Sequence, residues 1–73
     1  MINKRIVITA GAAGIGLTIA QKYIAAGAKV AVCDINKIAI DTFRIMYPDA
    51  LAVKADVTIE ADMLDFFESC DNY

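Results

Sequence analysis

Three glycines stand close together in the segment ITAGAAGIGLTIA, residues 8–20, between two apolar runs. The run before them, residues 4–10 (KRIVITA), is β-branched and mostly apolar, which is typical of a strand buried on both faces of a parallel sheet. After them, four apolar residues recur at helical spacing: Ile15, Ile19, Tyr23 and Ile24. Gly27 follows where a glycine commonly ends a helix. The segment therefore predicts a strand, a tight loop and a helix.

The same succession of strand and helix follows twice more. Residues 28–34 (AKVAVCD) repeat the strand pattern, and Asn36 supplies an N-cap for a helix that Pro48 terminates. The apolar face of this helix is expected to comprise Ala39, Phe43 and Met46. Residues 50–56 (ALAVKAD) predict a third strand.

A final helix follows the third strand, with Thr58 as its expected cap. Its apolar stripe is expected to consist of Ile59, Met63, Phe67 and Cys70. The resulting order βαβαβα predicts an α/β fold with a parallel sheet. At 73 residues, the chain is at most one small domain, residues 1–73, of marginal stability.

Composition excludes several classes of protein. Hydrophobic residues make up 59% of the chain, which argues against a disordered tail, and the longest uncharged stretch, residues 6–21, holds glycines and threonines instead of a spanning aliphatic run. No signal-peptide block follows Lys4 and Arg5, so a cytoplasmic location is expected. Without histidine or a Cys-x-x-Cys pair the sequence offers no metal site, and Cys33 and Cys70 are expected to be buried thiols.

Charge is distributed unevenly along the chain. Residues 1–55 carry seven basic and three acidic groups, a net +4, whereas residues 56–73 carry six acidic groups and no basic one, a net −6. The sum is −2, and the scattered basic residues form no stripe for a phosphate backbone. We therefore expect neither nucleic-acid nor membrane binding.

The glycine loop has the position of an anion site. It leaves the carboxyl end of a strand and opens a helix, so that backbone N–H groups and the helix dipole converge on a site that suits a pyrophosphate. The spacing of Gly11, Gly14 and Gly16 matches neither Gly-x-Gly-x-x-Gly nor the Walker pattern. On its own the loop leaves open an ordinary strand-to-helix turn.

The segment TAGAAGIG, residues 9–16, resembles the Thr-Gly-x-x-x-Gly-Ile-Gly pattern of the classical short-chain dehydrogenases/reductases, with Gly14, Ile15 and Gly16 in register. Ala10 stands where the family has its first glycine, and Gly11, one place later, is the candidate for that glycine's role. The resemblance implies a partial, truncated Rossmann fold in which Gly11, Gly14, Ile15 and Gly16 bind a dinucleotide.

Asp34 ends the second strand, twenty positions after Gly14. A carboxylate there can accept both hydroxyls of an adenosine ribose, and it would repel a ribose phosphate. No arginine follows Asp34, and Lys37 is the one basic residue nearby that could bind the ribose phosphate of NADP. The sequence therefore favours NAD over NADP. The alternative is a solvated turn aspartate, although the spacing favours the cofactor role.

Asp56 and Val57 follow the third strand and look like the Asp-Val pair with which the same family contacts the adenine ring. Alternatively, Asp56 only helps to cap the last helix beside Thr58. Because the glycine loop, Asp34 and Asp56 each follow a successive strand, all three should meet at the sheet edge where open parallel sheets bind ligands.

The resemblance spans the whole chain but only the opening part of the family's domain. The family's catalytic Ser, Tyr-x-x-x-Lys and Asn-Asn-Ala-Gly segments are absent, because neither Tyr23 nor Tyr47 has a lysine four residues later and the printed sequence stops at Tyr73. No catalytic residue is assigned, and the chain alone should be inactive. In the full-length protein the family resemblance implies hydride transfer between the nicotinamide and an alcohol or carbonyl substrate.

Two other interpretations stay open: a non-catalytic module for nucleotide binding or partner assembly, and a folded relic without a ligand. The family's strand order places the first strand beside a fourth strand that this sequence lacks, leaving an open edge. The first two helices should share one sheet face, with the last helix alone on the other. We therefore expect self-association, or pairing with the missing remainder of the domain.

Overall fold

The computed structural model describes residues 4–73, and it contains three strands that alternate with three helices. They are β1 (Arg5–Thr9), α1 (Gly14–Ala25), β2 (Lys29–Asp34), α2 (Lys37–Met46), β3 (Leu51–Lys54) and α3 (Glu60–Asp71). The predicted order βαβαβα is confirmed. None of the helices in this described part is long and apolar enough to cross a membrane.

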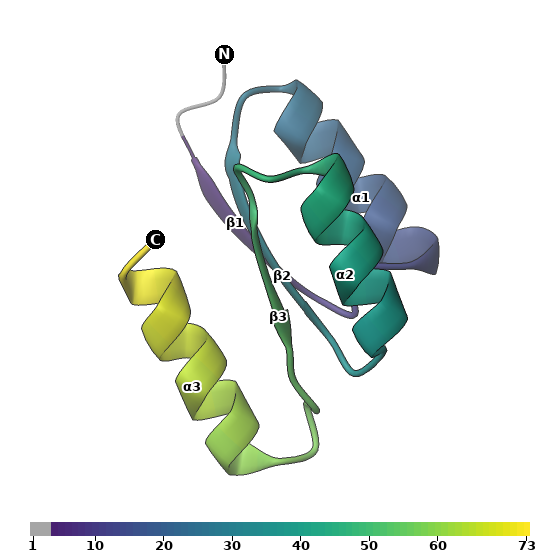
Figure 1. The fold of residues 1–73 in the computed structure, drawn as a ribbon. Helices are drawn as coiled ribbons and strands as arrows, with labels where there is room; N and C mark the ends of the chain where they lie inside the picture. Colours follow the sequence, from purple (N-terminus) through teal and green to yellow (C-terminus); the bar gives the residue numbers. More distant parts are fainter. Residues whose placement is uncertain (1–3) are drawn as a thin grey trace.

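The strands form one parallel sheet in the order β1-β2-β3. The register pairs Thr9 with Cys33 and Asp34 with Lys54, so the three strands end at one edge of the sheet. Within residues 4–73, β1 pairs only with β2 and forms one side of the sheet, as expected. Figure 1 shows α1 and α2 on one face of the sheet and α3 on the other. The expected partial Rossmann arrangement is therefore confirmed.

Strand β2 is buried on both faces, which explains its continuous apolar sequence. Toward α1 and α2, Val30 and Val32 join one apolar cluster with Ile40 and Phe43. Toward α3, a second cluster is formed by Ala31, Cys33, Ala55 and Phe66. These two clusters hold the three layers together and fix the ends of the strands.

The apolar face predicted for α1 is partly wrong. Ile15 is 82% exposed and Ile19 is 42% exposed, whereas Ala20 is fully buried. Leu17 and Ile24 pack with Ala20 against the core, three and four positions from it. The stripe is offset from the one predicted because the small Ala20 lies at the point of contact with the core.

The predictions for α3 also need correction. Phe66, and not Phe67 of the predicted stripe, is fully buried against the sheet, and Phe67 is 49% exposed. Thr58 does not cap the helix: the N-cap position is Ile59, without a side-chain hydrogen bond. Of the two cysteines, Cys33 is buried as expected, but Cys70 is only half-buried.

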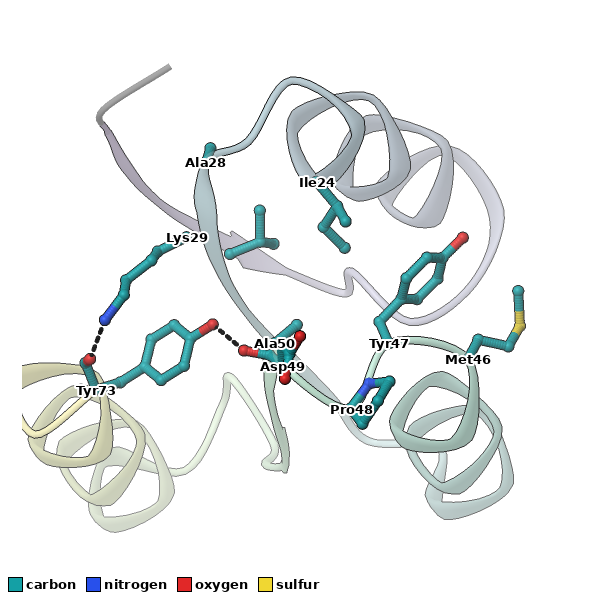
Figure 2. Close-up of a pocket in the computed structure, with 10 residues that line it drawn as sticks. Ile24, Ala28, Lys29, Met46, Tyr47, Pro48, Asp49, Ala50 and Tyr73 are labelled. Atoms are coloured by element: carbon teal, nitrogen blue, oxygen red, sulfur yellow. Dashed lines mark hydrogen bonds between the residues drawn. The ribbon is translucent and has the colours of Figure 1, made fainter. Parts of the chain in front are cut away.

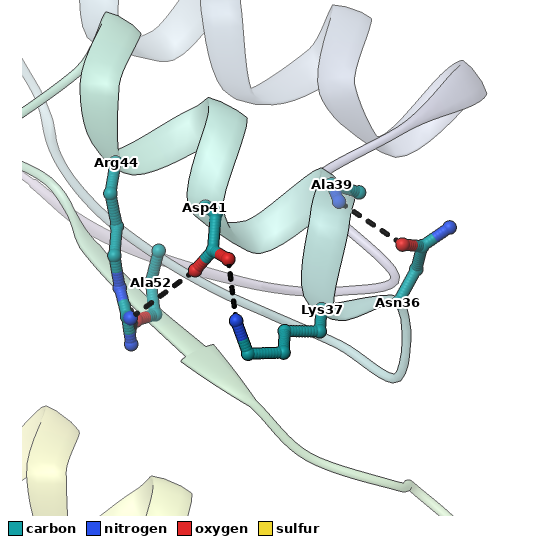
Figure 3. A network of polar contacts seen from close by, with 6 residues as sticks. All are labelled: Asn36, Lys37, Ala39, Asp41, Arg44 and Ala52. Carbon is teal, nitrogen blue, oxygen red and sulfur yellow. Dashed lines mark hydrogen bonds and ion pairs between the residues drawn. The ribbon is translucent and has the colours of Figure 1, made fainter.

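Helix α2 begins as predicted, since the Asn36 side chain accepts a hydrogen bond from the Ala39 N–H at 3.1 Å (Figure 3). Farther along, the Arg44 guanidinium donates two hydrogen bonds to the Ala52 carbonyl of β3, at 3.0 and 2.7 Å. Asp41 accepts a hydrogen bond from Lys37, and this contact lowers the pKa of Asp41. The cap fixes the start of α2, and Arg44 ties the helix to β3.

Candidate functional site

The glycine loop connects the carboxyl end of β1 to α1 and is fixed to the neighbouring strand. The Gly11 N–H donates to the Cys33 carbonyl at 3.2 Å. The backbone is left-handed at Ala10, with φ +54°, and again at Gly14, with φ +59°. Ala10 thus adopts the conformation that the family's first glycine would adopt more readily.

The reason why glycine suits the loop differs from one position to the next. A Cβ at Gly11 would lie 2.7 Å from Val32 Cγ1, and one at Gly16 would lie 2.1 Å from the Ala10 carbonyl oxygen. Because Gly11 has no side chain, the loop can pack closely on β2. Because Gly16 has none, the first turn of α1 can pack closely on the loop. A Cβ at Gly14 would meet nothing within 4 Å, so only the positive φ favours glycine there.

Among the residues that the structure describes, no side chain caps the first turn of α1. Its N-cap residue, Ala13, makes no side-chain hydrogen bond, and the turn contains no acidic residue. The free N–H groups and the positive end of the helix dipole therefore face the loop without a capping side chain. This is the electrostatic environment that an anionic group requires.

Asp34 lies half-buried at the end of β2. Its Oδ1 accepts a hydrogen bond from the Asn36 N–H at 3.1 Å, while its own carbonyl accepts one from the Ala55 N–H at 3.1 Å. Asp34 therefore makes the local hydrogen bond that is typical of a turn aspartate. That bond orients the carboxylate through Oδ1 and does not use Oδ2.

Asp56 follows β3 and is held in place by Thr58. Its Oδ1 accepts hydrogen bonds from the Thr58 N–H at 2.9 Å and the Thr58 hydroxyl at 2.6 Å. These bonds lower the pKa of the Asp56 carboxyl below its usual range, because they favour its charged form. The Asp56 N–H in turn donates to Asp62 Oδ2 at 3.0 Å, which joins the loop to α3.

The side chains at the carboxyl edge of the sheet surround a small cavity of about 120 Å³, which brings together part of the predicted site. It is lined by Ala10, Asp34, Ile35, Ala55, Asp56 and Val57. A cavity of about 360 Å³ shares Ile35, Ala55 and Asp56 with it, so the two are neighbours, and we refer to them together as the depression.

The remaining predicted residues, Gly11, Gly14, Ile15 and Gly16, do not line this depression. They belong to the adjacent loop and the first turn of α1. Sequence reasoning missed Ile35, a large apolar side chain that is 62% exposed and lines both cavities. Its place directly after Asp34, at a strand's carboxyl end, is the signal that would have found it.

Comparison with known proteins identifies the family. The sequence model of the short chain dehydrogenase family matches residues 4–73. The chain belongs to this family. An uncharacterised oxidoreductase of Mycobacterium bovis is 45% identical to it, over 89% of this chain and 28% of the relative. A short chain dehydrogenase/reductase of Colletotrichum higginsianum is 32% identical, over 93% of this chain and 27% of the relative.

Solved structures of larger proteins contain the same fold. A 3-ketoacyl-(acyl-carrier-protein) reductase from Brucella melitensis, in complex with NADH, superposes with a TM-score of 0.82 at 29% identity, over 93% of this chain and 28% of that one. A protein described as a 3-oxoacyl-reductase from Bacillus thuringiensis gives the same TM-score at 26% identity, over 99% of this chain and 31% of that one. This short-chain dehydrogenase chain thus spans less than a third of the length of these relatives.

Proposed function

We propose that residues 1–73 are the NAD(H)-binding, N-terminal part of a short-chain dehydrogenase whose catalytic part lies outside this sequence. The observation that carries the proposal is the depression at the carboxyl edge of the sheet, where Asp34, Asp56 and Val57 lie beside the glycine loop. Open parallel sheets bind nucleotides at this edge. A cytoplasmic location stays a prediction.

The residues present fit a dinucleotide. The uncapped first turn of α1, with Gly11, Gly14, Ile15 and Gly16, would hold the pyrophosphate, because its N–H groups are free and no acidic side chain repels an anion. The open space beside Gly14 leaves room for close approach of the backbone to a phosphate.

The two aspartates would hold the adenosine. Asp34 would accept hydrogen bonds from the ribose hydroxyls, and its negative charge would repel the extra phosphate of NADP. The fixed carboxylate of Asp56 would accept a hydrogen bond from the exocyclic amine of adenine through Oδ2, since the Thr58 bonds use Oδ1. Val57, which is 57% exposed, would contact the ring.

When bound, the nicotinamide supplies the hydride donor or acceptor, so that the full-length protein would interconvert an alcohol and a carbonyl compound. The 73-residue chain itself would bind and orient the adenosine half of the cofactor and would have no activity alone. Activity should require the remainder of the domain, which contributes the family's tyrosine and lysine.

The experiment that tests this proposal is calorimetric titration of the chain with NAD. Asp34→Ala should raise the Kd for NAD about tenfold or more, because hydrogen bonds to a charged group are each worth about 1.5–3 kcal/mol. Asp34→Asn should narrow the preference for NAD over NADP, since it removes the repulsive charge. Asp65→Ala, in the exposed part of α3, is the matched control and should leave the Kd unchanged.

A second candidate is a non-catalytic module that binds a nucleotide or assembles with a partner. The open side of β1 favours it, because an unpaired strand edge is a site for pairing with another chain. Both candidates predict the effect of Asp34→Ala on NAD binding. Only the first predicts that adding the remaining part of the domain produces dehydrogenase activity, and absence of NAD binding would exclude the first.

A further inference from the structure

Lys54 lies beside Asp34 at the carboxyl edge of the sheet, although the two residues are far apart in the sequence. The register of β2 and β3 pairs Asp34 with Lys54, just as it pairs Val32 with Ala52. Val32 and Ala52 both belong to the apolar cluster toward α1 and α2. Because side chains alternate along a strand, Asp34 and Lys54 also leave the sheet from one and the same face. Neighbouring strands lie about 5 Å apart, so the two side chains start next to each other.

The Lys54 ammonium is available to a ligand of the depression. Lys54 is exposed and lines the larger of the two cavities, next to the smaller cavity that Asp34 lines. Within residues 4–73, the ion pairs are made by Asp41, and no hydrogen bond or ion pair engages Lys54 Nζ. Asp56 and Asp62 line the same cavity as Lys54, but neither is paired with it in this part of the chain. An ammonium with three unused N–H groups therefore faces the dinucleotide site.

Two other lysines near the sheet are already engaged. Lys37, which follows Asp34 closely in the sequence, donates a hydrogen bond to Asp41 at 2.8 Å and does not line the depression (Figure 3). Lys29 lies at the opposite end of β2 and donates to the Tyr73 carbonyl at 2.9 Å (Figure 2). Lys54 is thus better placed than either of them to interact with an anionic group beside Asp34.

We propose that Lys54 offsets the negative charge of Asp34 and so weakens the discrimination of the site against the 2′-phosphate of NADP. The inference rests on the proposed function, because it concerns the same dinucleotide site. Asp34 alone would repel a phosphate group, but an ammonium on the neighbouring strand adds an attraction of opposite sign at the same place. The chain should therefore prefer NAD to NADP by less than about tenfold. Lys54, and not Lys37, is the basic residue that sets this preference.

The test is calorimetric titration of the chain with NAD and with NADP, before and after removal of one positive charge. Lys54→Gln should raise the Kd for NADP about threefold to fivefold, as expected for one exposed ion pair, and change the Kd for NAD by less than about twofold. Lys37→Gln is the matched control, because it removes the same charge from a residue that Asp41 already engages. It should leave the ratio of the two Kd values within about twofold of the original.

A second pair of ligands isolates the extra phosphate. Adenosine 5′-phosphate and adenosine 2′,5′-bisphosphate differ in that group alone, and Lys54→Gln should weaken binding of the bisphosphate only, with the fold checked by circular dichroism. The inference is overturned if Lys54→Gln leaves the Kd ratio of either pair unchanged, or if Lys37→Gln shifts it equally. In those cases NAD still binds and the proposed function stands. If the original chain binds no NAD, the proposed function fails and this inference fails with it.

Discussion

Ala10 holds a backbone conformation that glycine adopts more readily, with φ +54°. The left-handed region costs an L-residue about 1–2 kcal/mol, and glycine loses about 0.5–1 kcal/mol more entropy on folding than alanine. Ala10→Gly should therefore stabilise the chain by about 0.5–1 kcal/mol. In thermal unfolding, we expect Tm to rise by about 4 °C.

Gly14→Ala provides the matched control for Ala10→Gly. Gly14 has φ +59°, and an added Cβ meets no atom within 4 Å, so backbone conformation alone is tested. This variant should lose about 1 kcal/mol of unfolding free energy. If Tm fell for both variants, strain at Ala10 would not be what limits the stability of the loop.

At the scale of one element, α3 depends on which of its two adjacent aromatic rings faces the sheet. Phe66 is fully buried and Phe67 is 49% exposed. Phe66→Leu should reduce the unfolding free energy by about 1 kcal/mol, because it leaves space in a closed cluster, whereas Phe67→Leu should change it by less than about 0.5 kcal/mol. Denaturant unfolding of the two variants measures the difference, and equal effects would contradict the packing of α3.

The helices and strands were predictable from the sequence, because the spacing of apolar residues and the residue types at the ends of an element depend on short stretches of chain. The run KVAVC indicates a strand buried on both faces. Asn36 marks the start of a helix, because its side chain can accept a hydrogen bond from a backbone N–H of the first turn. The contact between Ala20 and the core was not predictable, because a periodic pattern fixes a face only to within a residue or so. Phe66 and Phe67 differ by a single position, and only packing against Cys33 and Ala55 distinguishes them.

The candidate site was predictable to the extent that parallel topology brings strand ends together. That rule placed Asp34 and Asp56 at one edge of the sheet, where they line one cavity. The conformation of Ala10 was not predictable, because alanine seldom has a positive φ. The place of Lys54 beside Asp34 also escaped prediction, because it depends on the register of β2 and β3.

At the scale of the whole molecule, the two faces of the sheet are covered unequally. Ile6 and Ile8 of β1 pack toward α1 and α2, but Val7, on the face that α3 covers only in part, is 47% exposed. In the described part of the chain, no strand pairs with the other side of β1. An apolar surface beside a free strand edge favours pairing with a second chain.

Val7→Lys should reduce the self-association that we propose for this chain. A lysine on an edge strand opposes edge-to-edge pairing, because two such strands would bring like charges together and remove both ammonium groups from water. Light scattering over a range of concentrations should show the original chain as larger than 7.9 kDa and the variant nearer to that mass. Thr42→Lys, on the exposed side of α2, adds the same charge away from the edge and should not change the association. A monodisperse monomer of the original chain would contradict pairing through β1, and equal effects of both lysines would assign the association to net charge instead.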